Sequence, residues 1–171
     1  MSDELGGNIR RMVPDDLERV LAWRNHPEVR KYMYTQHEIS LAEHARWFER
    51  ASLDERKHLL IVERNGEALG FVNFSLAGVA AIADWGFYVS PDAPRGSGRL
   101  LGQTALAHAF GPLALHKVWG QALAYNERSI SFHLRQGFQQ EGVLRHQHYD
   151  GQSYHDVVCF GLLASEWPVS T

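Results

Sequence analysis

Cysteine is scarce in this chain of 171 residues, which contains only Cys159. An internal disulfide is therefore excluded, and with it the disulfide-stapled scaffolds of small secreted proteins. No apolar run approaches the ~20 residues that a membrane-spanning helix needs, so we expect no membrane partner. The formal net charge is −3, which offers no overall positive field for nucleic acid. An anionic ligand would have to be bound by a local group of cations.

Targeting signals and interdomain linkers are also missing. The first residues, MSDELGGN, are acidic and contain glycine, unlike a signal peptide, so we expect a cytoplasmic protein. No internal repeat or low-complexity tract divides the chain. A chain of this length can bury roughly 70% of its unfolded surface in one core. We therefore predict one domain over residues 1–171, with residues 1–7 as a flexible N-terminal tail.

The spacing of apolar residues and turn formers predicts an α/β fold with a mixed sheet. Asn65-Gly66 is the natural turn of a hairpin, Ser40 and Glu43 form a capping box, and Asn126 suits the start of a helix. The expected order is a strand (8–13), two helices (from 14 and from 40), three strands (58–64, 68–76 and 80–89), a helix (from 99, ended by Gly111-Pro112), a strand (117–125), a helix (126–137) and a long hairpin (138–163).

A glycine-bearing loop, PRGSGRLLGQ, joins the strand 80–89 to the following helix. Its glycines let backbone amides face a ligand at a helix N-terminus, where the helix dipole favours a phosphate. Arg95 and Arg99 add positive charge. The loop lacks the Gly-Lys-Ser/Thr ending of a nucleotide-triphosphate loop and the third glycine of a dinucleotide fingerprint. Its pattern indicates another kind of phosphate site, or only a plain strand-to-helix turn.

The order of elements, the R-G-x-G before the central helix and the later N-E-R-S-I-S-F-x-x-x-x-G-F resemble the GNAT acetyltransferases over nearly the whole chain. The resemblance implies the GNAT fold, with a mostly antiparallel central sheet flanked by helices, and acetyl-CoA as co-substrate. Leu100 departs from the family, which usually has Gly or Ala there. The cofactor contacts that the resemblance implies are Trp85, Gly86, Phe87, Tyr88, Val89, Arg95, Gly96, Ser97, Gly98, Arg99, Leu100, Asn126, Ser129 and Phe132.

Acetyl transfer needs an amine held against a thioester, an oxyanion donor and a proton for the leaving thiolate. The family implies a backbone amide near 86–88 as the oxyanion donor. At the position of His133 the family often has a tyrosine that protonates the CoA thiolate. The imidazole of His133 can also donate a proton near neutral pH. We predict that His133 is the catalytic acid. The alternative is that His133 is only a partly exposed residue of the helix. No Gly-x-Ser-x-Gly nucleophile is present, so direct attack by the amine is favoured.

The general base is predicted separately. Asp84 lies on the strand that would face the thioester, and burial would raise its pKa into a useful range. The alternative is that Asp84 is simply a polar residue of an edge strand. His26 and His44 are rival bases.

The stretch LAWRNHPEVRKYMYTQHEISLAEHARWF (21–48) mixes cations, imidazoles and aromatic rings without one apolar face. Its R-N-H-P, M-Y and I-S-L-x-x-H segments resemble the N-acetyltransferases of pseudaminic acid biosynthesis, which acetylate the 4-amino group of a UDP-linked 4-amino-4,6-dideoxy sugar. Cations suit a diphosphate and soft or aromatic side chains suit a base and a deoxy-sugar. Taken singly, Met33 and Trp47 could instead be core residues, and Arg30 and Lys31 could be a solvated helix end. The predicted substrate contacts are Arg24, His26, Met33, Tyr34, His44 and Trp47.

Other functions stay open. A protein N-terminus, a polyamine or an aminoglycoside would also serve as acceptor for this fold. The basic character of 21–48, with acids only at Glu28, Glu38 and Glu43, argues against the two polycations. Loss of the family tyrosine keeps a non-catalytic module that binds CoA or a nucleotide sugar among the alternatives.

The late hairpin adds two minor features. His146 and His148 share a strand, but two potential ligands without a third make a poor zinc site, so we predict no metal. Tyr149 and Tyr154 flank the hairpin turn and are expected to cover the acceptor site or a homodimer partner.

Overall fold

The computed structural model describes residues 6–168, with 1–5 and 169–171 outside the described part. The strands are β1 (Asn8–Arg11), β2 (Lys57–Arg64), β3 (Glu67–Leu76), β4 (Ile82–Val89), β5 (Lys117–Leu123), β6 (Gln139–Tyr149) and β7 (Tyr154–Leu163). The helices are α1 (Leu17–Asn25), α2 (Pro27–Arg30), α3 (Leu41–Ser52), α4 (Ser97–Phe110) and α5 (Glu127–Arg135), with 3-10 turns η1 (Pro14–Asp16) and η2 (Ala164–Glu166).

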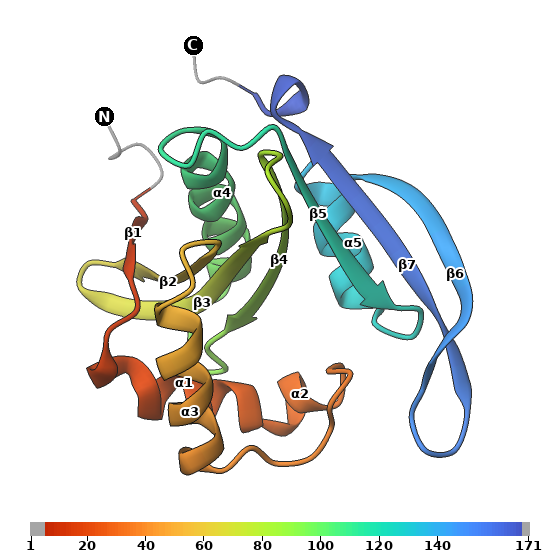
Figure 1. The fold of residues 1–171 in the computed structure, drawn as a ribbon, viewed down its shortest axis with the longest axis horizontal. Helices are drawn as coiled ribbons and strands as arrows, with labels where there is room; N and C mark the ends of the chain where they lie inside the picture. Colours follow the sequence, from red (N-terminus) through yellow and green to blue (C-terminus); the bar gives the residue numbers. More distant parts are fainter. Residues whose placement is uncertain (1–5, 169–171) are drawn as a thin grey trace.

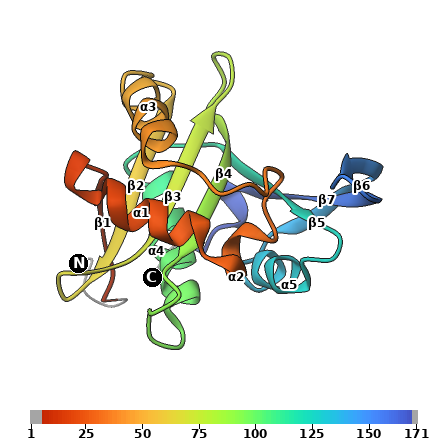
Figure 2. The same cartoon turned by 90° about the horizontal axis from the view of Figure 1, so that it is seen from below.

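The strands form one seven-stranded sheet in the order β1-β2-β3-β4-β5-β7-β6. Every neighbouring pair is antiparallel except β4 and β5, which are parallel. Helices α4 and α5 pack on one face, and α1 and α3 pack on the other (Figures 1 and 2). The predicted α/β fold with a mixed, mostly antiparallel sheet is therefore confirmed.

Local signals placed most element ends correctly. The Asn65-Gly66 turn joins β2 to β3, and the Ser40 hydroxyl accepts a hydrogen bond from the Glu43 amide at 3.2 Å to cap α3. Two expectations were wrong in detail. Helix α4 begins at Ser97, so the glycine loop runs directly into its first turn. The single turn α2 was not predicted, although Pro27 at its first position favours a helix start.

Parallel pairing between β4 and β5 is short. It runs from Ile82↔Lys117 to Asp84↔Trp119, after which the two strands diverge (Figure 1). The divergence leaves a gap in the middle of the sheet, which we call the β4–β5 gap. Because β4 leads into α4 and β5 leads into α5, both helices begin near the open end of this gap.

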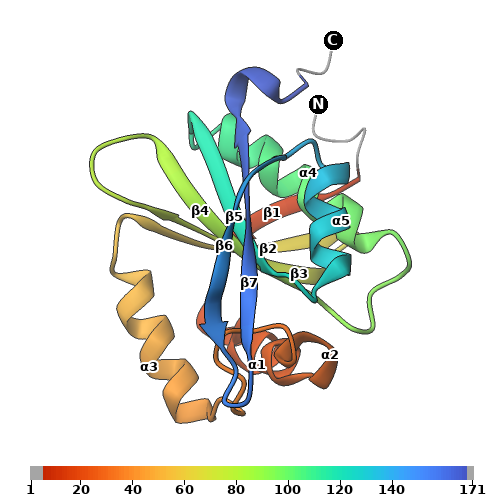
Figure 3. The same ribbon diagram turned by 90° about the vertical axis from the view of Figure 1, so that its right-hand side faces the viewer.

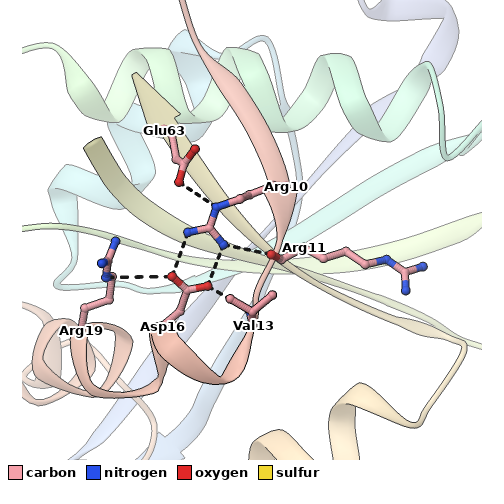
Figure 4. Close-up of polar contacts among 6 residues, drawn as sticks. All are labelled: Arg10, Arg11, Val13, Asp16, Arg19 and Glu63. Atoms are coloured by element: carbon pink, nitrogen blue, oxygen red, sulfur yellow. Dashed lines mark hydrogen bonds and ion pairs between the residues drawn. The ribbon is translucent and has the colours of Figure 1, made fainter. Parts of the chain in front are cut away.

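A buried ion pair fixes the start of α1 (Figure 4). Asp16 is 1% exposed and accepts hydrogen bonds from Arg10 Nη1 at 2.7 Å and Nη2 at 2.8 Å, and from the Val13 amide at 2.9 Å. Arg10 Nε also donates to Glu63 on β2 at 2.7 Å. The hydrogen bonds from Arg10 lower the pKa of Asp16 in spite of its burial. This network ties β1, η1 and β2 together and so orients α1.

The ends of the chain add two observations. Residues 1–5 of the predicted flexible tail lie outside the described residues, whereas Gly7 lies against Thr104 and Leu100 of α4. None of the helices within residues 6–168 has the length and apolar character to cross a membrane.

Candidate active site

The β4–β5 gap has two differently lined faces. Ala83 and Trp85 belong to the core under α4 and α5, so the alternation of a strand turns Asp84, Gly86 and Tyr88 toward α1 and α3. Since Asp84 is the last residue of β4 paired with β5, Gly86 and Gln121 lie level with each other across the gap. A reacting group held between these strands would therefore have Asp84, Gly86 and Gln121 on its α1 side.

The glycine loop leads into a helix start of the kind that can bind an anion. Gly96 precedes α4 with φ +92°, a left-handed conformation that favours glycine. Ser97 is buried, and its hydroxyl donates to the Pro94 carbonyl at 2.6 Å. The Ser97 and Leu100 amides also have acceptors, in Pro94 and Gly96. The amides of Gly98 and Arg99 are therefore left for a phosphate at the dipole end.

The charged side chains of the loop are available as well. Arg95 and Arg99 are both exposed beside the first turn of α4. Gly98 places no side chain over the amides. The arrangement fits the pyrophosphate that was predicted for this loop. The Leu100 side chain is buried and its amide is bonded to Gly96, so its contact with the cofactor stays a prediction.

The predicted contacts on α5 and β4 form a packed aromatic group. Phe132 lies 4.8 Å from Phe87 and 6.1 Å from Trp85, measured between ring centroids. The Asn126 side chain accepts a hydrogen bond from the Ser129 amide at 3.1 Å and caps α5. Val89 packs on the same core. These residues shape the α5 side of the gap, and the Asn126 oxygen is already used within the protein.

His133 is the residue whose setting differs most from expectation. It is 1% exposed, so the alternative of a partly exposed helix residue is wrong. Its Nε2 accepts a hydrogen bond from the Trp85 indole at 3.1 Å, and its Nδ1 lies 2.8 Å from the Ser129 carbonyl. Burial lowers the pKa of His133. The acid role stays a prediction, but in this geometry the only ring proton is on Nδ1 and is donated to a carbonyl.

Asp84 occupies the position expected of a base. Strand β4 lies between β3 and β5, so the alternative of an edge-strand residue is wrong. Asp84 is half-buried between Ser75 of β3 and Trp119 of β5, its register partners. Burial raises the pKa of the Asp84 carboxyl, although Lys57 opposes this effect. A carboxylate with a raised pKa at the edge of the gap can accept a proton from a bound amine.

Asn73 is a site residue that sequence reasoning missed. Its side-chain oxygen lies over Gly86, where an added Cβ would be 2.7 Å from Asn73 Oδ1. A polar residue inside the apolar strand ALGFVNFSL was the signal that could have found it. Gln121 was missed for another reason, because only the sheet order reveals that it faces the gap.

Arg24 is buried without a carboxylate partner. It is 7% exposed, its Nη2 donates to the Thr35 carbonyl at 2.6 Å, and its Nη1 has no hydrogen-bond partner among the described residues. Burial raises the pKa of Tyr88 and the nearby Arg24 guanidinium opposes the shift. Arg24 thus carries a positive charge to the α1 side of the gap, beside Tyr88 of β4.

The segment between α2 and α3 lies over the ends of β5 and the β6–β7 hairpin (Figure 3). The Tyr34 hydroxyl donates to Gln121 Oε1 at 3.0 Å, and the Tyr34 ring meets His148 edge-on at 5.1 Å. Met33 is half-buried in the same segment. Tyr125, just before α5, stacks on Tyr32 at 6.1 Å. Tyr34 is therefore brought next to the gap, as predicted for a substrate contact.

The remaining predicted substrate contacts lie elsewhere. His26 caps α2, accepting the Glu28 amide at Nδ1 at 3.2 Å. His44 is 5% exposed and stacks on Trp47 at 5.3 Å, and burial lowers the pKa of its imidazole. Trp47 in turn meets Phe71 edge-on at 5.9 Å in the core under α1 and α3. Trp47 thus packs as its alternative of a core residue expected, and His44 packs beside it; their contact with a substrate stays a prediction.

Two open hollows lie on the surface, and neither is lined by residues of β4 or β5. One of about 380 Å³ lies between α1, the β2–β3 turn and the loop after β4. The other, of about 360 Å³, follows α2. Within residues 6–168, no three His, Cys, Asp or Glu side chains gather as a metal site would require, so His146 and His148 have no third partner.

Comparison with known proteins agrees with this geometry. Residues 8–139 match the family model of the acetyltransferase (GNAT) domain. The acetyltransferase PseH of Campylobacter jejuni is 22% identical over 131 residues, 77% of this chain and 82% of that protein. The spermidine N(1)-acetyltransferase of Escherichia coli is 23% identical over 152 residues, 88% of this chain and 82% of that protein. Spermidine N-acetyltransferase from Vibrio cholerae, solved with CoA and spermine, superimposes with a TM-score of 0.85 at 22% identity, covering 94% and 97% of the two chains.

Proposed function

Because this chain belongs to the GNAT acetyltransferase family, we propose that it transfers acetyl from acetyl-CoA to the 4-amino group of a UDP-linked 4-amino-4,6-dideoxy sugar. The likeness to the acetyltransferase PseH, at 22% identity, supports acetyl transfer, whereas the acceptor is argued from the residues of the site. The start of α4 would hold the pyrophosphate of acetyl-CoA through the Gly98 and Arg99 amides and the Arg95 side chain. Acetyl-CoA supplies an activated thioester. The protein holds the two substrates in position, offers charged groups that bind them and transfers the proton.

The choice of acceptor rests on the buried guanidinium of Arg24. A buried charge is costly unless it is paired, and Arg24 has a carbonyl but no carboxylate near it among residues 6–168. A phosphate oxygen of the acceptor would supply that partner through a charge-assisted hydrogen bond. A nucleotide-linked sugar brings a diphosphate, whereas spermidine brings further positive charge.

The carboxylates of the same region favour an anionic acceptor as well. Glu28 pairs with Lys31 at 3.0 Å, Glu38 with Arg30 at 3.9 Å, and Glu43 with His37 at 3.3 Å. A polycation would therefore compete with three existing pairs. The V. cholerae spermidine acetyltransferase shares the fold, but 22% identity carries no acceptor specificity.

The proposed chemistry is direct attack by the sugar amine on the thioester carbonyl, which forms the amide C–N bond and breaks the C–S bond. CoA leaves as the thiolate and takes its proton from solvent as the products depart. Asp84 is the proposed base that takes the amine proton, and a backbone amide near Gly86 is the proposed oxyanion donor. Tyr34 and Gln121, joined at 3.0 Å, would close the acceptor side of the gap. Water would then be displaced from the reacting atoms, which strengthens these interactions.

An acceptor panel tests the proposal. The purified protein is incubated with acetyl-CoA and, in turn, the UDP-linked 4-amino-4,6-dideoxy sugar, spermidine and a peptide with a free N-terminus, and free CoA thiol is followed. We expect thiol release with the sugar nucleotide alone. Release with spermidine or the peptide but not with the sugar would overturn the proposal. Sugar binding without release would instead favour a non-catalytic module.

Replacing Arg24 by Met should weaken binding of the sugar nucleotide. Loss of a hydrogen bond to a charged group costs about 1.5–3 kcal/mol, so we expect KM for the acceptor to rise roughly 10- to 150-fold with KM for acetyl-CoA unchanged. Arg24→Lys should recover part of the loss. Arg50→Met, which removes an exposed cation of α3, is the matched control. An unchanged acceptor KM in a folded Arg24→Met protein would remove Arg24 from the acceptor site.

A further inference from the structure

His133 and Trp85 form a buried hydrogen-bonded pair on the α5 side of the β4–β5 gap. The Trp85 indole N–H donates to Nε2 of His133 at 3.1 Å. Nε2 must therefore lack a proton, and Nδ1 carries the proton that is donated to the Ser129 carbonyl at 2.8 Å. The imidazole is thus a neutral connector with both nitrogens in use.

The surroundings of His133 allow the ring no other orientation. It stacks on Phe160 with centroids 4.8 Å apart and planes within 8°. Phe138 and Phe132 meet it edge-on at 5.0 and 5.8 Å. Burial among these apolar rings removes the water that a charged imidazole would need, so the neutral ring is favoured. Turning His133 toward a ligand would break two hydrogen bonds and this packing together.

The pair touches β5 where the gap opens. A Cβ at Gly120 would lie 2.8 Å from Trp85 Nε1 and 2.9 Å from His133 Nε2. Gly120 directly follows Trp119, the last residue of β5 paired with β4. One hydrogen bond therefore brings together α5, β4 and β5 at the point where the strands separate.

We propose that His133 is a positioning residue for the acetyl-transfer site, and that it acts through Trp85. By accepting the indole proton it fixes Trp85, and with it the β4 backbone at Gly86, where the oxyanion donor is proposed. It also sets how far β4 stands from β5 at the closed end of the gap. The inference rests on the acetyl-CoA site of the family, independently of which amine is the acceptor.

A set of three variants tests this role. His133→Leu fills the site with an apolar side chain but leaves the indole N–H buried without an acceptor. The dissociation constant for acetyl-CoA should therefore rise about 5- to 100-fold. His133→Gln restores an acceptor for the indole, and should return the constant to within about threefold of the original protein. The double change His133→Leu with Trp85→Phe removes both partners and should recover part of the loss.

The measurements do not require the correct acceptor. Calorimetric titration with acetyl-CoA gives the dissociation constants, and nitrogen-15 spectra of the His133 ring should show one Nδ1–H tautomer unchanged between pH 6 and 8. Where an acceptor turns over, kcat of His133→Gln should also be near that of the original protein. If His133→Leu does not fold, Trp85→Phe alone carries the test, with a loss in the same direction.

The opposite results are equally specific. If His133→Gln loses as much affinity for acetyl-CoA as His133→Leu, the positioning role is wrong. It is also wrong if the ring titrates near neutral pH, because the imidazole then acts in proton transfer. If His133→Leu and Trp85→Phe both bind acetyl-CoA normally, the pair does not set the gap. A failed acceptor panel with an intact rescue pattern would overturn the sugar substrate and leave this inference standing.

Discussion

Replacing Asp84 by Asn is expected to lower kcat roughly 100- to 10,000-fold, the usual contribution of a positioned general base. Asn has nearly the same size, so the half-buried position between β3 and β5 should be kept. Its amide cannot accept the amine proton, and the amine would then attack only in its rare unprotonated form. Steady-state rates with saturating acetyl-CoA and acceptor measure the loss.

The pH dependence identifies the group. Because burial raises the pKa of Asp84 above its ordinary value of 3.8, the rate should fall as the pH drops through that raised pKa. The limb that belongs to Asp84 should be missing from Asp84→Asn, whose rate should fall only with protonation of the amine. Asp15→Asn, which changes an exposed carboxylate on η1, should leave both rate and profile unaltered. A kcat within about threefold of the original would exclude Asp84 and leave His26 as the rival base.

Replacing Asp16 by Ala is expected to destabilise the fold by about 3 kcal/mol, the low end for breaking a buried ion pair, because Arg10 stays partly exposed. The Arg10 guanidinium loses two hydrogen bonds and the Val13 amide loses its acceptor (Figure 4). Urea unfolding gives the change in the free energy of unfolding. Asp15→Asn, at the neighbouring exposed position, should change it by no more than about 0.5 kcal/mol.

The same carboxylate should govern acid stability. The pKa of Asp16 is lowered by Arg10, so its contribution is present above the unfolded value near 3.8 and is lost as the pH falls toward the lower folded pKa. The original protein should therefore lose stability on acidification below about pH 5, and Asp16→Ala should lose less over that window. Parallel losses in both proteins would place the acid-sensitive group elsewhere.

Local chemistry explains which parts of the fold could be predicted. The Asn65-Gly66 turn, the Ser40 cap and the Asn126 cap each depend on a few neighbouring residues, and each is found as expected. The glycine loop before α4 follows from glycine and backbone amides alone, although the helix begins at Ser97 and not at the predicted Arg99. Such features need no knowledge of distant contacts.

The parts that failed depend on contacts between distant residues. Asp84 was assigned a possible edge position because strand order is set by long-range pairing. His133 is enclosed by Phe160 and Phe138, whose approach to α5 no local pattern records. Gln121 faces the gap only because β5 pairs with β4 on one side and β7 on the other.

The short β4–β5 pairing also has a mechanical meaning. The sheet consists of two panels, β1–β4 and β5–β7–β6, joined by the three residue pairs from Ile82↔Lys117 to Asp84↔Trp119. A rotation between the panels would bend at those pairs, and the contact of Trp85 and His133 with Gly120 would limit it. Small rotations of one panel against the other would widen or narrow the whole opening at once.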